Sequence, residues 1–243
     1  MRGLTFAVEA PYFACFRRPT ATSSLLTFPL PPPSTLFGMI LNAMGVESKR
    51  DTTPYFLGMK LLQERVKINI SPLSLERPVR ELAEMLKLIE REVERRPRSF
   101  PSSPIFKELL VRPSYKVYLA SKDEALIGEI AAALRNPARP LYIGQSDDMA
   151  VVDLLWEGEV RKEKGKKLFG LLRGTVEGCE LLRLPFGFEE NSVLYLPLLS
   201  LPKNLPFELD QPREAFIFDG EAVELFGVED VVRQKGRRAF SNA

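Results

Sequence analysis

The sequence predicts an α+β fold, in which a mixed first half precedes a β-rich second half. Apolar residues recur at every second position in short runs, as in strands, and at three- and four-residue spacing in longer runs, as in helices. After about residue 150 only short strand-like runs follow, separated by Gly and Pro. A length of 243 residues fits one large domain or a domain with a smaller satellite.

The first elements follow from periodicity and capping. Residues 4–8 alternate between apolar and smaller or polar side chains, which predicts a half-buried strand. Residues 12–33 are expected to form a long irregular loop, and long structured loops are often functional. Helical spacing then predicts a helix over 34–44, with Ser34 as its N-cap and Gly45 as its stop.

The middle of the chain adds a strand, a helix and a loop. Alternating apolar residues predict a strand over 65–70. Pro78 is suited to the first turn of a helix, and apolar residues repeat at helical spacing as far as Val93. We therefore expect a helix from Pro78 to about residue 94. The Pro-, Arg- and Ser-rich segment 95–104 is expected to be a loop.

The next elements repeat the strand and helix pattern. Residues 114–120 are typical of a strand. Ser121 and Glu124 form a capping-box signature, which predicts a helix that Asn136-Pro137 ends. Residues 140–143 are expected to form a fourth strand.

This order is strand, helix, strand, insertion, strand, helix, strand. It predicts a ferredoxin-like (RRM-like) N-terminal domain over 1–152, with an insertion over about 71–113. The remainder, 153–243, is predicted to be a β-rich C-terminal region with a basic tail. RNA-recognition domains use the ferredoxin-like plan and bind bases on the sheet face or on adjacent loops, although a fold alone does not give a function.

Composition limits the chemistry. The chain has no His, which excludes Ser-His, Cys-His and His-metal mechanisms. Its net charge is only +2, so a nucleic-acid surface has to come from the placement of Lys and Arg. Cys15 and Cys179 lie far apart and are expected to be reduced thiols of a cytoplasmic protein. We expect no cofactor, no metal, no signal peptide and no membrane span.

The best candidate for a binding site is the loop from Tyr12 to Ser24. Its two arginines can pair with phosphates, its hydroxyls can contact phosphates or 2′-OH groups, and its aromatic rings can stack on bases. The alternative is an ordinary loop with core aromatics and solvated arginines. The RNA-binding residues predicted in this loop are Tyr12, Phe16, Arg17, Arg18, Thr20, Thr22, Ser23 and Ser24.

Other candidate contacts are scattered along the chain. Basic residues also cluster in 95–98, in 162–167, which is expected to be a hairpin tip, and in the tail. Each is more often a solvated charge than a contact, but their number makes an RNA surface plausible. The further residues predicted to bind RNA are Lys49, Arg50, Arg77, Gly144, Gln145 and Ser146.

The segment FRRPTATSSLLTFPLPPPSTLFGMILNAMG, residues 16–45, resembles the signature of the Cas-five family. These are the RAMP-superfamily proteins of type I Cascade complexes. That signature has an F-R-[KR]-P-like segment, a Ser/Thr-rich stretch, a proline-rich turn and a helix containing Gly, here Gly38. Residues 108–121, a following helix and residues 140–152 are similar to the family's later strand, helix and strand with a G-x-S turn. The resemblance covers about residues 1–155.

The resemblance implies a ferredoxin-like domain whose insertion, about 71–113, is the family's thumb. It implies a subunit that holds the 5′ handle of the CRISPR RNA (crRNA), with Arg17, Arg18 and the hydroxyls after them as handle contacts. Its implied partners are the repeating backbone subunit and the large subunit, which recognises target DNA.

One branch of the family cleaves precursor RNA with Tyr, Lys and His side chains, and the absence of His argues against that branch. We therefore expect a non-catalytic subunit. Two alternatives stay open: a metal-independent endoribonuclease that processes precursor crRNA, and a docking protein that binds no RNA.

Overall fold

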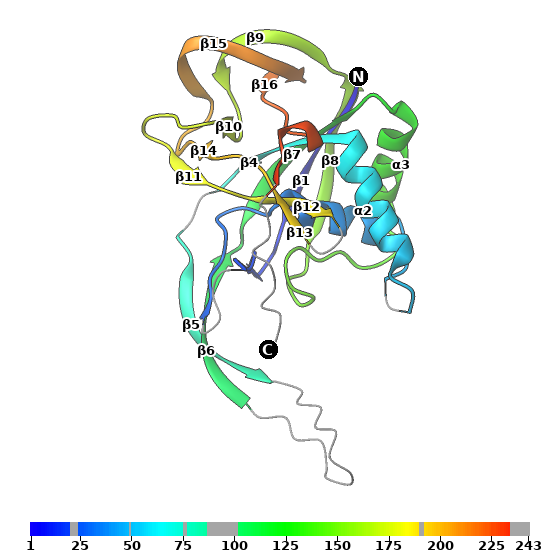
Figure 1. The fold of residues 1–243 in the computed structure, drawn as a ribbon, viewed down its shortest axis with the longest axis vertical. Coiled ribbons are helices and arrows are strands. Elements are labelled where there is room, and N and C mark those ends of the chain that lie inside the picture. Colours follow the sequence, from blue (N-terminus) through cyan, green and yellow to red (C-terminus); the bar gives the residue numbers. More distant parts are fainter. Residues whose placement is uncertain (20–23, 49, 75–76, 87–101, 190–191, 234–243) are drawn as a thin grey trace, which may run out of the picture.

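The computed structural model describes residues 1–19, 24–48, 50–74, 77–86, 102–189 and 192–233. Over these residues the fold is mixed α/β and sheet-rich, with three α-helices. Figure 1 shows a body of sheets and helices, from which a two-stranded arm extends.

The main sheet of the first half has four strands in the order β4-β7-β1-β8, and each neighbouring pair is antiparallel. The strands predicted over 4–8, 65–70 and 114–120 are confirmed as β1, β4 and β7. Side chains alternate between the two faces, as a strand requires. The four strands are β1 (Arg2–Glu9), β4 (Val66–Pro72), β7 (Ser114–Ser121) and β8 (Val151–Glu159).

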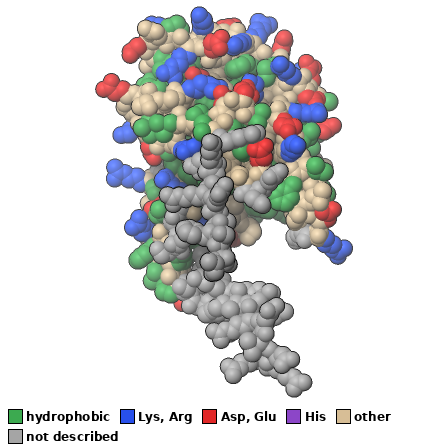
Figure 2. Space-filling model, viewed as in Figure 1, with side chains coloured by type: hydrophobic (Ala, Val, Ile, Leu, Met, Phe, Trp, Pro, Cys, Tyr) green, Lys and Arg blue, Asp and Glu red, His purple; other side chains and the backbone are tan. Residues whose placement is uncertain are grey.

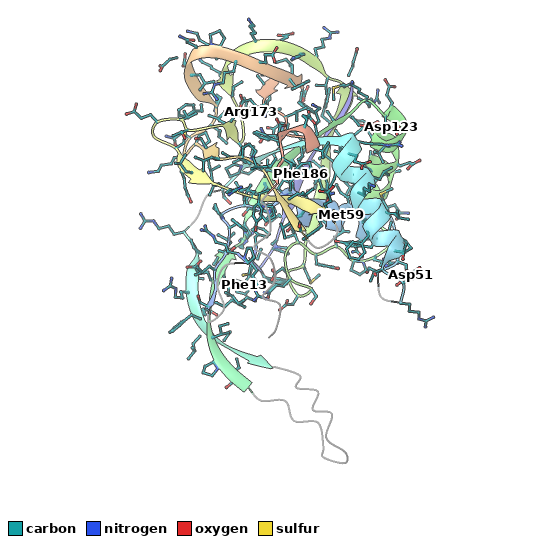
Figure 3. All side chains as sticks on the ribbon, viewed as in Figure 1. Phe13, Asp51, Met59, Asp123, Arg173 and Phe186 are labelled. Atoms are coloured by element: carbon teal, nitrogen blue, oxygen red, sulfur yellow. The ribbon has the colours of Figure 1, made fainter. Side chains whose placement is uncertain are left out.

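Three helices pack against one face of this sheet: α1 (Pro33–Ala43), α2 (Thr53–Arg65) and α3 (Glu124–Arg135). Residues of α1 and α3 join Leu4 and Phe6 of β1 in a core whose central side chains are 0% exposed. Figure 3 shows Met59 of α2 and Phe186 inside the body, near this helical layer.

The predicted helices over 34–44 and from Ser121 are present, but their caps differ. Pro32 is the N-cap of α1 in place of Ser34, because Pro33 already occupies the first turn. Asp123 caps α3 in place of Ser121, since its side chain accepts the Leu126 N–H at 3.2 Å.

The insertion contains an arm in place of a helix. The arm is the antiparallel pair β5 (Val79–Leu86) and β6 (Ser102–Val111). The predicted helix from Pro78 is therefore wrong over 79–86, and the predicted loop is wrong over 102–104. Residues 87–101 lie outside the described residues. Pairing with β6 satisfies the backbone of β5, and such tertiary context overrides a helical spacing of apolar residues.

The predicted fourth strand over 140–143 is also wrong. Tyr142 makes a single bridge to Met149, and the strand that pairs with β1 is β8. The chain reverses at Gly144, whose φ is +101°, so the Ile143 N–H donates to the Asp148 carbonyl at 2.9 Å.

The second face of the main sheet is covered by the C-terminal half. Tyr118 and Trp156 each pack edge-on against Phe218, with ring centroids 5.5 and 5.8 Å apart. Asn69 is 1% exposed and donates to the Leu171 carbonyl at 2.9 Å. The C-terminal half therefore occupies the second face around Tyr118 and Trp156, where bases cannot stack, and the adjacent loops are the candidate surface for RNA.

The strand-rich pattern expected after residue 150 is confirmed, with three further three-stranded sheets. The segment 162–167 lies within strand β9, so the predicted hairpin tip is wrong. Residues 234–243 of the basic tail lie outside the described residues, and the division at residue 152 stays a prediction. The remaining strands are β9 (Arg161–Leu168), β10 (Leu172–Arg173), β11 (Glu180–Leu182), β12 (Pro185–Glu189), β13 (Ser192–Tyr195), β14 (Leu199–Leu201), β15 (Phe207–Phe218), β16 (Glu221–Val223) and β17 (Val232–Arg233).

Three negative observations apply to the described ranges. None of their helices is both long and apolar enough to cross a membrane. They contain no group of three or more His, Cys, Asp or Glu side chains placed to hold a metal ion. Cys15 and Cys179 are both free thiols.

Candidate nucleic-acid interface

The loop predicted as the binding site is fastened along the arm. Its strand β2 (Phe13–Ala14) pairs antiparallel with β6, and its strand β3 (Ser24–Leu25) pairs parallel with β6. A small apolar cluster of Cys15, Leu25 and Leu109 lies between loop and arm. We call the described residues of this segment, 12–19 and 24–28, the arginine loop. Its backbone is held by the strand of the arm on which it lies.

Two aromatic side chains of the arginine loop are exposed. Tyr12 is 66% exposed and Phe13 is 48% exposed, and Figure 3 shows Phe13 near the base of the arm. Phe16, in contrast, is 2% exposed and packs edge-on against Tyr115 at 5.9 Å. Phe16 belongs to the apolar core. Its ring is therefore not exposed for the stacking on bases that the sequence predicts.

Arg18 is held in place by its own loop. Its Nε donates to the Thr27 carbonyl at 2.8 Å, and its guanidinium lies 5.1 Å from the centre of the Phe28 ring. Neither Nη of Arg18 hydrogen-bonds to any part of the chain that the structure describes. Arg17, on the neighbouring position, is exposed. The loop thus presents two guanidinium groups to solvent.

An open groove of about 650 Å³ lies where the arginine loop, the base of the arm and the C-terminal half meet. We call it the arm-base groove. It brings together Arg18 and Arg77, which the sequence analysis singled out separately. Figure 2 shows several Lys and Arg side chains at the left edge of the body, at the level where the arm leaves it. The charged residues that line the groove are Arg18, Arg77, Arg80, Lys203, Glu108 and Glu180.

The carboxylate of Glu108 is neutralised within the groove. It accepts from Arg80 at 3.0 Å and from the Thr27 N–H at 3.1 Å. Four basic side chains therefore face two acidic ones, and one of the acidic groups is already paired. Such a concave surface with excess positive charge attracts a polyanion.

The turn at Gly144, Gln145 and Ser146 lies beside the arginine loop. One carboxylate oxygen of Asp148 accepts the Cys15 N–H at 2.9 Å and the Gln145 N–H at 3.0 Å. Lys107 of β6 donates to the side chain of Gln145 at 2.7 Å. The turn is thus joined to both the loop and the arm.

Asp148 is only 4% exposed, and burial raises its pKa above the ordinary value of an aspartate. Its two backbone hydrogen bonds act in the opposite direction and favour the charged form. An Asp in a turn is usually solvated, so no sequence pattern marks Asp148 as part of the site. The one sequence feature that could have indicated Asp148 is its position shortly after Gly144, where the chain reverses.

Not every predicted residue joins this interface. Ser24 lies in β3 on the arm, but Thr20, Thr22, Ser23 and Lys49 lie outside the described residues. Arg50 precedes Asp51, which Figure 3 shows at the right-hand edge of the body, away from the arm. Arg80 and Lys203 are groove residues that the predicted site lacked. Lys203 comes from a loop that only the folded chain brings near Arg18.

The geometry defines a mixed α/β protein with a basic groove at the base of an arm. The sequence profile described as CRISPR-associated protein (Cas_Cas5) matches residues 3–193. The chain therefore belongs to this family. Comparison with curated proteins by sequence gives no match.

Two solved structures resemble the chain. A chain of a CRISPR RNA-guided surveillance complex has 15% identity and a TM-score of 0.50, with 86% of this chain and 91% of that chain covered. A CRISPR protein from Archaeoglobus fulgidus has 16% identity and a TM-score of 0.49, with 91% of this chain and 97% of that chain covered. The first likeness establishes a shared fold.

Proposed function

We propose that this chain is an RNA-binding subunit of a type I Cascade interference complex, which caps the 5′ handle of the crRNA without catalysis. The observation that carries this proposal is the arm-base groove, where Arg18, Arg77 and Arg80 converge. The arginine loop that supplies Arg18 also carries two exposed aromatic residues. Family membership and the likeness to a chain of an RNA-guided surveillance complex agree with it.

The proposed N-terminal fold is ferredoxin-like. The order β4-β7-β1-β8, with neighbours antiparallel and helices on one face, supports this plan. On this view α1 and α3 are its two helices, α2 is an addition, and the arm is the thumb. The C-terminal half packs on the sheet face that an RRM exposes to RNA. We therefore expect RNA to bind to the loops beside the sheet.

The chemistry of the groove suits a single-stranded RNA. Guanidinium groups pair bidentately with phosphate oxygens, and Arg18 is already oriented by Thr27 and the Phe28 ring. Tyr12 and Phe13 offer exposed rings on which bases can stack. Affinity from such contacts falls as salt rises, because binding releases counterions.

The proposed protein partners are the backbone subunit and the large subunit, and through the latter the target DNA. Exposed apolar side chains on α2, namely Phe56 at 55% and Leu57 at 63%, support a protein contact there. The two free thiols support action in the reducing cytoplasm.

The proposal that the chain is non-catalytic rests on the absence of His and on the state of Tyr118. The Lys116 ammonium lies 5.5 Å from the centre of the Tyr118 ring. A Tyr and a Lys placed together can act as acid and base in RNA cleavage. However, the Tyr118 hydroxyl donates to Glu221 at 2.8 Å, and burial raises its pKa strongly. A tyrosine that holds its proton so firmly is a poor general base.

The test is RNA binding by the purified chain. A repeat-derived 5′-handle RNA and a scrambled RNA are titrated across salt, and the products are run on a denaturing gel. We expect tight, salt-dependent binding of intact handle RNA that Arg17→Ala with Arg18→Ala weakens. Site-specific cleavage that a 2′-deoxy substitution abolishes would replace the proposal with the endoribonuclease. Absence of any RNA affinity, alone and with partner subunits, would favour the docking protein.

A further inference from the structure

A second groove, of about 370 Å³, opens between the root of the arm and the C-terminal half. We call it the Tyr118 groove. Its lining combines polar groups with apolar surface, and Leu73 at its edge is 56% exposed. Such a mixture suits a ligand with a flat apolar part and polar edges. The residues that matter here are Ser71, Leu73, Tyr118, Phe169, Lys203 and Asn204.

The Tyr118 groove and the arm-base groove share one residue. Lys203 lines both of them, and it lies in the exposed loop between β14 and β15. The two grooves are therefore neighbours, and Lys203 stands between Arg18 on one side and Tyr118 on the other. A single chain bound in the first groove can therefore reach the second at Lys203.

The charges of the Tyr118 groove leave Lys203 as its exposed cation. Glu221 is neutralised, since it accepts from Lys116 at 2.5 Å and from Tyr118 at 2.8 Å. Lys116 is correspondingly engaged, with a side chain only 17% exposed. Lys203 forms no ion pair with any residue that the structure describes.

We propose that the Tyr118 groove is a nucleotide subsite for the same single-stranded RNA, with a phosphate on Lys203 and a base against Leu73 and Phe169. This inference rests on the proposed RNA-binding function and extends it from the first half of the chain to the second. Asn204 supplies an amide that can donate to and accept from a base edge. The C-terminal half is thus part of the RNA path.

The experiment compares handle RNA binding by the wild type, Lys203→Glu, Lys203→Ala and Lys166→Glu. Lys166 is an exposed lysine of β9 that lines neither groove, so Lys166→Glu is the matched charge control. We expect about a tenfold loss for Lys203→Glu, a smaller loss for Lys203→Ala and no change for the control. The salt slope is expected to fall by about 0.7 for the one lost phosphate contact.

Length dependence sharpens the test. RNAs shortened from either end are titrated against Arg18→Glu, which changes only the arm-base groove, and Leu73→Glu, which changes only the Tyr118 groove. The proposal predicts a short RNA that still responds to Arg18→Glu and no longer responds to Leu73→Glu. The Tm of each variant is measured as well, and a Tm equal to that of the wild type shows that folding is unchanged.

The outcomes separate the two proposals. If Lys203→Glu binds every RNA as the wild type does while Arg18→Glu binds weakly, the subsite is wrong and the proposed function stands. If the wild type binds no RNA, alone or with partner subunits, both proposals are wrong. If Lys203→Glu and Lys166→Glu weaken binding equally, the effect of Lys203 is general electrostatics, and the subsite is again wrong.

Discussion

Two basic regions of the chain are built in opposite ways. β9 carries five basic residues within seven positions, 161–167, whereas the arm-base groove draws its four basic side chains from three separate segments. β9 pairs with β15, and two of its lysines already face carboxylates: Lys162 lies 3.0 Å from Glu214 and Lys167 lies 3.9 Å from Glu208.

The comparison shows that many basic residues in a row along the sequence differ from basic side chains that the fold brings together in space. Lysines on an exposed strand have an ordinary structural role, because they discourage edge-to-edge pairing of strands. Arginines that meet in a concave surface focus the potential and fix a geometry for phosphates. We therefore expect the groove to bind RNA and β9 to contribute little.

The largest effect is expected from reversing two charges of the groove. Arg18→Glu with Arg77→Glu removes two phosphate contacts and adds repulsion, so affinity for the handle RNA is expected to fall by about 100-fold or more. Fluorescence anisotropy across salt measures this loss, and the salt slope is expected to drop by about 1.4. An affinity within about threefold of the wild type would mean that RNA does not enter the groove.

A smaller loss is expected from the exposed aromatic ring of Tyr12. Tyr12→Ala removes a stacking surface worth roughly 1–3 kcal/mol, which corresponds to about a 5- to 150-fold loss of affinity. Tyr12→Phe keeps the ring and is expected to bind normally. Phe56→Ala on α2, 55% exposed in the wild type, is the matched control. Equal losses in Tyr12→Ala and Phe56→Ala would count against stacking at Tyr12.

The turn beside the groove is tested through Gly144. Its φ of +101° disfavours other residues, and an added Cβ would lie 2.8 Å from a carboxylate oxygen of Asp148. Gly144→Ala is expected to cost about 2 kcal/mol and to lower Tm by about 4–8 °C. Gly178→Ala isolates the cost of a positive φ, since Gly178 has φ +78° and open space around its Cα. If calorimetry gives equal Tm shifts for the two variants, the close approach of the added Cβ to Asp148 does not contribute to the cost.

A weaker, pH-dependent effect is expected at Asp148. Burial raises the pKa of this carboxyl, so the folded state holds its proton more tightly than the unfolded state does. The contribution of Asp148 to stability is therefore present below its unfolded pKa and is lost as pH rises through its raised folded pKa. Denaturant unfolding should show the wild type losing stability relative to Asp148→Asn over that interval. A constant difference between pH 3 and pH 7 (roughly the window set by an ordinary Asp pKa) would contradict a raised pKa.

The smallest effect is expected on β9. Lys164→Ala with Lys166→Ala leaves the paired lysines of the strand intact, and handle RNA affinity should stay within about twofold of the wild type. The same anisotropy titration measures it. A loss as large as that of the Arg18 and Arg77 variant would reverse the comparison between the two regions.

Sequence alone predicted the elements that bury one regular face. β1, β4 and β7 alternate against the helical layer, and α1 and α3 bury one stripe each, so local periodicity specifies them. The helix α2 was missed, because Phe56 and Leu57 on its exposed side blur the apolar stripe. The first strand of the arm, β5, was predicted as a helix because its backbone partner is distant in sequence. That partner is β6, which also pairs with β2 and β3.

The candidate site was predicted in part for the same reason. The arginine loop was found from its residue types, and Arg77 was singled out from the sequence. Their convergence depends on pairing between residues far apart in the chain, as at Leu25 and Lys107. No local pattern indicates that Lys203 joins the groove or that Phe16 turns into the core. Contacts of this kind are decided by the tertiary fold.

The most direct test of the central claim locates the RNA on the protein. A 5′-handle RNA carrying photoreactive uridines is bound to the full chain, irradiated and digested, and the crosslinked peptides are identified by mass spectrometry. We predict crosslinks in the arginine loop and at the base of β5, with Tyr12 or Phe13 among the modified residues. Crosslinks concentrated in β9 and absent from the arginine loop would contradict the account.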